Sequence, residues 1–339
     1  MIVSIDLGYG YTKAISEKAD NIIFPSIIAP AGNRISGIEE MTLTKHFVSI
    51  RSANKQQTTD YYVGEKAIQE GRAAQLSIKR DKHNSNMAMI LLMTAAYLSG
   101  ADGNIVLGYG VPLSYYKAQR KEIEKILKNK EVFISVNNGP EKLLRFSEVH
   151  IFPQGVGILF NDSKIATNSL IGIIDIGYYT TDYLLTETSK NGFTPLYNYM
   201  SSIEIGVHTA QKHFGSIMQS ITGKAFSLVE LHGIWNKEKI AFAGETINIS
   251  EYKKEAVREA GQSLVESMIA AWSEKIDYLD VTILGGGGAL EFLDVFRGNI
   301  KGTRLTHDPQ FSNANGFYAM TKKKLEKLHS YHHHSSLTK

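Results

Sequence analysis

Cysteine is absent from the 339-residue sequence, which excludes a disulfide framework, a zinc–thiolate site and a cysteine nucleophile. Prolines are few, and 43% hydrophobic against 21% charged residues is the balance of a folded globular protein rather than a disordered or fibrous one. The longest nearly apolar run, at 87–98, is about half as long as a membrane-spanning helix, so it predicts a buried helix. The length exceeds one ordinary core and favours two domains.

Net charge is also small. The formal charge is +3 at pH 7, and the basic residues are spread along the sequence, so there is no electrostatic footprint for direct binding of nucleic acid. The first residues include Asp6 and no basic stretch before their apolar run, which does not fit a secretory signal. We therefore expect a cytoplasmic protein with no membrane contact and no direct contact with nucleic acid.

The alternation of apolar runs and turn residues predicts an α/β fold. Residues from about 30 to 64 are polar and turn-rich with short alternating stretches, which favours a small β insertion. A polar tail with three adjacent histidines, at 332–334, ends the sequence and is better explained as a solvated tail than as a metal site. Strands are expected at 2–7, 105–108 and 281–284, and helices at 87–98, about 115–128, about 250–272, 290–296 and 321–328.

The first candidate loop follows the N-terminal strand. Gly8 and Gly10 allow backbone amides to approach phosphate oxygens, Thr12 offers a hydroxyl, and Lys13 supplies a compact positive charge. Asp6 at the strand end would face a magnesium ion. A glycine-containing hairpin is also a common plain turn, so this loop alone leaves both interpretations open.

A second loop repeats this logic. Residues 170–182 (LIGIIDIGYYTTD) again run from an apolar strand through an aspartate and a glycine to hydroxyl residues, so the chain looks internally duplicated. Asp175 would be a buried carboxylate, which is costly unless it is paired or linked to a metal, and magnesium held by carboxylates and phosphates would satisfy it. The alternative is that Asp175 merely caps a turn.

A third element consists of four consecutive glycines, 285–288, between an apolar strand and an amphipathic helix. Glycine removes side chains where a flat base or a ribose must lie close to the backbone, and the run opens a helix. A flexible linker is the alternative, although the flanking strand and helix disfavour it.

In this order and spacing, the three elements resemble the actin, sugar-kinase and seventy-kilodalton chaperone superfamily. Shorter motifs narrow the resemblance to the ParM/StbA group and its archaeal actin-like relatives, from residue 2 to about 325: IFPS at 23–26, YVGE at 62–65, GVPL at 110–113, PQGVG at 153–157 and NGFY at 315–318. The resemblance implies an actin-like fold, with two duplicated ribonuclease H-like lobes around a nucleotide cleft. Lobe I would comprise 1–160 and 320–339 with an insertion at about 30–80, and lobe II would comprise 161–319 with an insertion at about 207–260.

The resemblance also implies site residues. The segment that links the lobes carries a glutamine or glutamate in this family, and the matching Gln154 would orient the attacking water. Catalytic roles fall to Gln154, Asp175 and Asp6, and a magnesium ion would lie at Asp6 and Asp175. ATP or ADP would be bound by Gly8, Tyr9, Gly10, Tyr11, Thr12, Lys13, Gly177, Tyr178, Tyr179, Thr180, Gly206, Gly285, Gly286, Gly287 and Gly288. Tyr178 and Tyr179 stand where relatives often carry smaller residues, which leaves open which groups of the second loop reach the phosphates. Tyr9 likewise stands in the first loop where some relatives carry a small polar residue.

The resemblance implies an ATPase that polymerises into filaments with ATP and Mg²⁺. A DNA-binding adaptor protein would link these filaments to centromere-like plasmid DNA. Two alternatives stay open: a small-molecule kinase of the same superfamily, and an actin-like scaffold that does not hydrolyse nucleotide. Gln154 favours water as the nucleophile over a second substrate. Retention of Asp6, Lys13, Gln154 and Asp175 disfavours a degenerate site.

Overall fold

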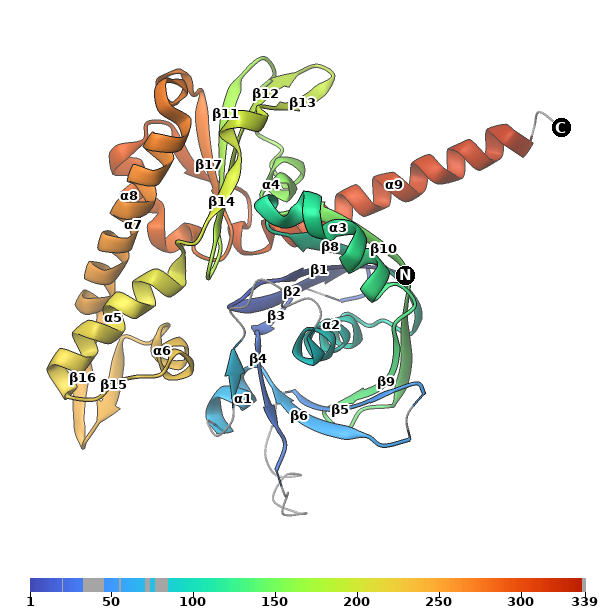
Figure 1. The fold of residues 1–339 in the computed structure, drawn as a ribbon, viewed down its shortest axis with the longest axis horizontal. Helices are drawn as coiled ribbons and strands as arrows, with labels where there is room; N and C mark the ends of the chain where they lie inside the picture. The colour runs from blue at the N-terminus through green and yellow to red at the C-terminus, as the bar shows by residue number, and fades with distance from the viewer. Residues whose placement is uncertain (20, 33–45, 55, 71–73, 77–84, 337–339) are drawn as a thin grey trace.

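The computed structural model describes residues 1–19, 21–32, 46–54, 56–70, 74–76 and 85–336 (Figure 1). Part of the expected β insertion, at 33–45 and 77–84, lies outside the described residues, as do the side chains of the three histidines at 332–334. Among the described residues, no helix is long and apolar enough to cross a membrane.

A ten-stranded sheet forms the first lobe, and it curls around helix α2 (Asn86–Leu98), which is apolar on nearly all sides (Figure 1). Helix α3 (Leu113–Leu127) covers its outer side, and the start of α9 (Ser312–Ser336) packs against β1 and β8. The strand order is β3-β2-β1-β8-β10-β9-β5-β6-β4-β7. The strands are β1 (Ile2–Leu7), β2 (Tyr11–Ser16), β3 (Ile22–Pro25), β4 (Ile27–Pro30), β5 (Phe47–Ser52), β6 (Thr59–Val63), β7 (Gln75–Leu76), β8 (Gly103–Val111), β9 (Glu131–Val136) and β10 (Lys142–Pro153), with α1 at Glu65–Glu70.

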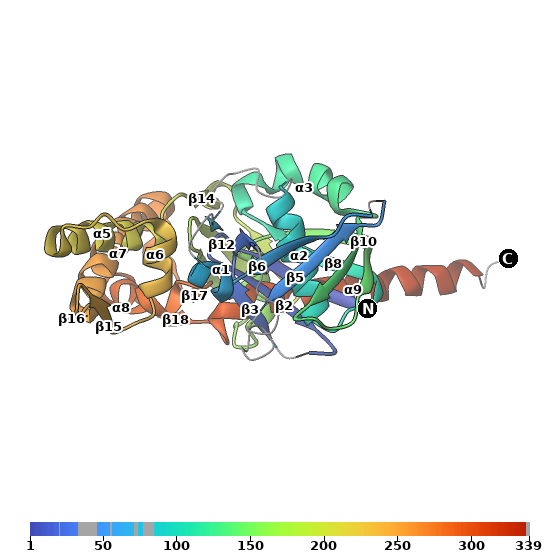
Figure 2. The ribbon, with the colours of Figure 1, turned by 90° about the horizontal axis from the view of Figure 1, so that it is seen from below.

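A six-stranded sheet forms the second lobe, in the order β13-β12-β11-β17-β18 with β14 paired to β12. Helices α5, α7 and α8 gather on the side of this sheet away from the first lobe (Figure 2), whereas α6 contacts α1 and α4 contacts α9. The strands are β11 (Leu170–Ile176), β12 (Thr181–Ser189), β13 (Gly192–Pro195), β14 (Ser201–Ile203), β17 (Val281–Gly285) and β18 (Thr303–Leu305). The helices are α4 (Val156–Asn161), α5 (Val207–Thr222), α6 (Leu228–Ile234), α7 (Ser250–Trp272) and α8 (Ala289–Asn299), and β15 (Lys239–Phe242) and β16 (Glu245–Asn248) form a separate hairpin.

The two sheets share one local plan, which confirms the predicted duplication. In the first, β1 and β2 form an antiparallel hairpin and β8 runs parallel to β1. In the second, β11 and β12 form the hairpin and β17 runs parallel to β11. The fold is therefore the predicted α/β architecture of two duplicated lobes, and the two hairpin turns face the same space between them.

The expected elements are present, with one clear difference. The last helix was expected at 321–328 but begins at Ser312. Asn and Gly are weak helix formers, which hides the first turns from a sequence pattern. Those turns are stabilised by packing on α4, because a Cβ on Gly316 would lie 2.1 Å from the Gly157 carbonyl oxygen and a Cβ on Gly157 would lie 2.9 Å from Asn313.

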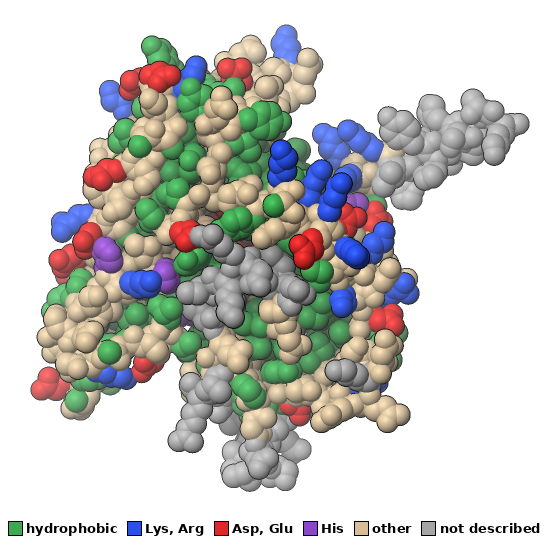
Figure 3. Space-filling view, viewed as in Figure 1, with side chains coloured by type: hydrophobic (Ala, Val, Ile, Leu, Met, Phe, Trp, Pro, Cys, Tyr) green, Lys and Arg blue, Asp and Glu red, His purple; other side chains and the backbone are tan. Residues whose placement is uncertain are grey.

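Some of the lysines and arginines that are scattered in the sequence lie close together on the surface of the folded protein. In the view of Figure 3 they gather over α3 and the adjoining part of α9. The exposed lysines of these two helices include Lys117, Lys121 and Lys125 on α3 and Lys322, Lys323 and Lys324 on α9.

Candidate functional site

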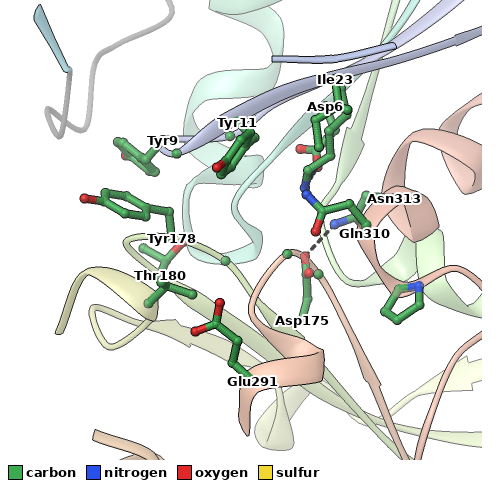
Figure 4. Close-up of a pocket in the computed structure, with 18 of the residues that line it drawn as sticks. Asp6, Tyr9, Tyr11, Ile23, Asp175, Tyr178, Thr180, Glu291, Gln310 and Asn313 are labelled. Atoms are coloured by element: carbon green, nitrogen blue, oxygen red, sulfur yellow. Dashed lines mark hydrogen bonds and ion pairs between the residues drawn. The ribbon is translucent and has the colours of Figure 1, made fainter. Parts of the chain in front are cut away.

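A cavity of about 480 Å³ lies between the two lobes, at the turns of both hairpins. This is the size range of small-molecule sites. Figure 4 shows Asp6 and Asp175 approaching each other from the two lobes, with Tyr9, Tyr11 and Tyr178 along one side. The cavity is lined by residues of β1, β2, β11, the turn before β12, α6, and the segments around 286–291 and 309–313.

Asp6 is held at one wall by two neighbours. Its Oδ2 accepts a hydrogen bond from Lys13 Nζ at 3.1 Å, and its Oδ1 accepts one from Gln154 Nε2 at 2.9 Å. All three side chains are buried. The antiparallel register that pairs Asp6 with Lys13 accounts for the first contact, and the Gln154 backbone N–H to the Val111 carbonyl fixes the second.

Asp175 stands at the opposite wall, where Asn313 Nδ2 donates to its Oδ2 at 2.6 Å (Figure 4). Burial, and after it the Asp6 carboxylate, raises the pKa of Asp175 to about 6. Burial and then the Asp175 carboxylate raise the pKa of Asp182, on β12, to about 7. Three carboxylates therefore converge where water is largely excluded, and a nearby cation would stabilise their charged forms.

The loops that carry these side chains depend on glycine at two places. A Cβ on Gly10 would lie 2.9 Å from the ring of Tyr178, so the two hairpin turns can meet only because this side chain is missing. Gly286 has φ of +87°, and a Cβ there would lie 2.5 Å from the Ile176 carbonyl oxygen. Gly10 therefore lets the two hairpin turns meet across the cleft, and Gly286 lets the turn after β17 lie close to β11 within the second lobe.

The other end of the cavity is aromatic. The Tyr11 and His232 rings are 5.0 Å apart between centroids, and those of Tyr178 and His232 are 5.6 Å apart. Asn236 Nδ2 donates to Tyr11 Oη at 3.2 Å, and Trp235 also lines this end. Flat rings with a few polar groups suit a heterocyclic base.

Most of the predicted site residues line the cavity. Asp6, Lys13, Gln154 and Asp175 do so, as do Gly8, Tyr9, Gly10, Tyr11, Gly177, Tyr178, Thr180, Gly286 and Gly287. Tyr178 presents its ring to the cavity and donates its hydroxyl to Gln211 Oε1 at 2.8 Å, so it is a wall residue.

The expected hydroxyl contact of Thr12 is wrong. Thr12 is fully buried, and its hydroxyl lies 2.9 Å from Ser26 Oγ, on the opposite face of β2 from Tyr11 and Lys13. Side chains alternate along a strand, so only every second residue of β2 can face the cleft.

Four more predicted residues lie beside the cavity without lining it. Tyr179 turns to Glu204, to which its hydroxyl donates at 3.1 Å, and packs on Tyr9. Gly206, Gly285 and Gly288 serve close packing, since a Cβ on each would meet another part of the second lobe or the nearby Ile158 at 2.8 Å or less.

Several lining residues were not predicted from the sequence. Asp182 belongs to the quoted motif LIGIIDIGYYTTD and could have been named from it. Asn313 precedes the quoted NGFY motif, whereas His232, Trp235 and Asn236 carry no local signal.

Within the part of the chain that the structure describes, no cluster of three His, Cys, Asp or Glu side chains could hold a metal unaided. Asp6 and Asp175 nevertheless fit a magnesium ion, because it prefers oxygen ligands and is commonly held by one or two carboxylates together with phosphates. Burial, and after it the Asp6 carboxylate, raises the pKa of Asp175, so a cation bound there would favour its charged form.

Two family models of actin-like proteins match this chain, one over each lobe. Residues 4–157 match the family model of the actin-like proteins' N-terminal domain, and 173–298 match that of the C-terminal domain of MreB-like archaeal actin homologues. Archaeal actin homologues of Thermoplasma volcanium and Thermoplasma acidophilum are each 26% identical over 329 residues, which is 94% of this chain and 97% of theirs.

Solved structures share the fold. A chain of a 15-stranded ParM filament from Clostridium botulinum superposes with a TM-score of 0.84 at 23% identity, over 95% of this chain and 99% of that one. The crystal structure of an archaeal actin homologue in complex with ADP superposes with a TM-score of 0.78 at 24% identity, over 95% and 99% of the two chains.

Proposed function

The chain belongs to the actin-like proteins, and on that premise we propose that it binds ATP with Mg²⁺ between its lobes, hydrolyses the ATP and polymerises into filaments. The observation that carries the proposal is that the buried side chains of Asp6, Lys13, Gln154 and Asp175 meet in one cavity between the lobes. ADP in one structural relative and filament assembly in another agree with it.

The phosphates would lie at the two hairpin turns. The N–H groups of Gly8 and Gly177 close the two turns, so the backbone N–H groups at 9–10 and 178–179 would donate to the phosphate oxygens, and Lys13 would supply positive charge from beside Asp6. Magnesium, held by Asp6 and Asp175 together with the phosphates, would neutralise charge on the γ-phosphate.

Gln154 would position the water. Its Nε2 donates to Asp6, which fixes the amide plane and leaves the Oε1 to accept a hydrogen bond from water. An amide is too weakly basic to remove that proton, so its contribution is orientation, and phosphoryl transfer depends largely on placement and charge stabilisation. Slow hydrolysis is the expected result.

Closure of the lobes would couple nucleotide to assembly. Because ATP would contact both hairpin turns at once, it would favour the conformation in which the lobes are close, and hence whichever state packs into a filament. We further propose a cytoplasmic protein whose filament is joined to centromere-like plasmid DNA by a DNA-binding adaptor, on the strength of the resemblance to ParM.

Phosphate release with ATP in the presence of Mg²⁺ or of a chelator tests the activity. We expect Mg²⁺-dependent release that Asp175→Asn abolishes, whereas Asp294→Asn, an exposed aspartate on α8, leaves it unchanged. A wild-type protein that binds no ATP would contradict the proposal. Transfer of the phosphate to a small molecule would favour a kinase instead.

A further inference from the structure

Helix α3 of the first lobe lacks a cap from its own chain neighbourhood. It begins at Leu113 after Pro112, which makes no side-chain capping hydrogen bond. The first N–H groups of any helix need acceptors from outside the helix. Here the acceptors come from the second lobe: Leu113 N–H donates to Asp182 Oδ1 at 2.6 Å, and Ser114 N–H donates to Ser202 Oγ at 3.0 Å.

The second lobe presents these two acceptors side by side. Strand β14 pairs with β12 so that Ser202 lies directly across from Asp182, and the Ser202 hydroxyl donates to the same Asp182 Oδ1. We call Leu113, Ser114, Asp182 and Ser202 the clasp. One residue further along α3, Tyr115 Oη donates at 3.4 Å to Oε1 of Glu204, the residue that follows β14, which extends the same contact.

Two physical effects at this position favour the ionised form of Asp182, in opposition to the burial that raises its pKa. The N-terminus of a helix carries partial positive charge, so a negative group there is stabilised, and a charged acceptor makes a stronger hydrogen bond than a neutral one. Asp182 is 2% exposed, so neither effect is strongly screened by solvent. The cap is complete only while the two lobes hold their present relative orientation.

The clasp also adjoins the candidate catalytic site. Asp182 lines the cavity, and burial, followed by the Asp175 carboxylate, raises its pKa. In the first lobe, the segment just before α3 holds Gln154, the candidate water-positioning residue, because the Val111 carbonyl oxygen accepts a hydrogen bond from the Gln154 backbone N–H at 2.8 Å. A change in how α3 meets the second lobe would therefore move Gln154 relative to Asp175.

We propose that Asp182 is a positioning residue, which caps α3 across the cleft with the help of Ser202 and thereby sets the angle between the lobes. The catalytic consequence rests on the proposed function, because the angle matters for turnover only if ATP is hydrolysed in this cavity. The clasp itself does not depend on nucleotide and can be tested without it.

The absence of cysteine makes the lobe angle directly measurable. Cysteines introduced as Glu65→Cys on α1 and Lys237→Cys after α6 are exposed and lie on elements that meet at the opening between the lobes, because α1 contacts α6. Spin labels on both, measured by double electron–electron resonance without nucleotide, report the distance between the lobes.

We expect Ser202→Ala and Asp182→Ala to shift the distance distribution to longer values and to broaden it. Asp182→Asn keeps an acceptor oxygen for Leu113 N–H and should stay near the wild-type distance. The matched control is Ser201→Ala, the neighbouring half-buried serine on β14. Wild-type distributions for both Ser202→Ala and Asp182→Ala would overturn the proposal, and if Asp182→Ala fails to fold, Ser202→Ala decides alone.

Turnover separates positioning from stability. For Ser202→Ala we expect kcat for phosphate release to fall by roughly threefold or more with KM little changed, at an unaltered thermal unfolding midpoint. Altered distances together with wild-type kcat would overturn the catalytic part. A wild-type protein that releases no phosphate would refute the proposed function, while the distances would still test the clasp.

Discussion

Gly286→Ala is the substitution whose effect the structure specifies most fully. Gly286 begins the turn between β17 and α8 with φ of +87°, a conformation that costs an L-residue about 1–2 kcal/mol. The new Cβ would also lie 2.5 Å from the Ile176 carbonyl oxygen and against Asp175 Oδ1, and such overpacking costs about 1–3 kcal/mol. We therefore expect the free energy of unfolding to fall by about 2–5 kcal/mol.

The matched control is Gly298→Ala on α8. A Cβ there meets nothing within 4 Å, and Gly298 lies inside a helix, so alanine should stabilise the protein by about 0.4–1 kcal/mol. Urea unfolding followed by the fluorescence of the two tryptophans measures both changes. Calorimetry should also show weakened ADP binding for Gly286→Ala alone, because Asp175 is displaced. Equal stabilities for Gly286→Ala and wild type would refute this reasoning.

Three further outcomes are expected. Asp175→Ala should abolish Mg²⁺-dependent phosphate release, and normal turnover would remove Asp175 from its assigned role. Gln154→Ala should slow hydrolysis by about tenfold to a hundredfold while ATP binding by calorimetry persists, because it positions water and contacts Asp6; unchanged turnover would contradict this. Burial lowers the pKa of both His208 and His232 to about 4, whereas the pKa of an unfolded histidine is about 6.5. Between pH 6.5 and pH 4 the unfolded state therefore binds more protons than the folded state. Stability should then drop by about 1.4 kcal/mol per pH unit for each histidine, and urea unfolding at pH 7.5 and 5.5 should show a smaller loss when both are changed to Phe. An identical loss in that variant would show that these histidines are not the cause.

The parts of the fold that could be predicted are those with a strong local signal. Strand β1 and helix α7 match their expected bounds because apolar periodicity continues to both ends of each. The first turns of α9 could not be seen, since their stability comes from contact between Gly316 and Gly157, which are far apart in the sequence.

The site residues likewise fall into those that the sequence pattern reveals and those that depend on long-range contacts. Asp6 and Asp175 stand at strand ends beside glycine, a pattern that sequence alone displays. Strand alternation would have excluded Thr12, had it been applied to β2. By contrast, the part played by Asp182 depends on its pairing with Ser202 and on the approach of α3, and that of His232 depends on how α6 folds over the cleft. No local pattern contains such long-range information.

The central claim is that nucleotide binding between the lobes drives assembly, and 90° light scattering on the purified protein with Mg²⁺ tests it most directly. We predict scattering that rises on addition of ATP only above a threshold protein concentration, with phosphate release following in parallel and with persistent scattering when a non-hydrolysable analogue replaces ATP. Phosphate release without scattering at any protein concentration would contradict the account.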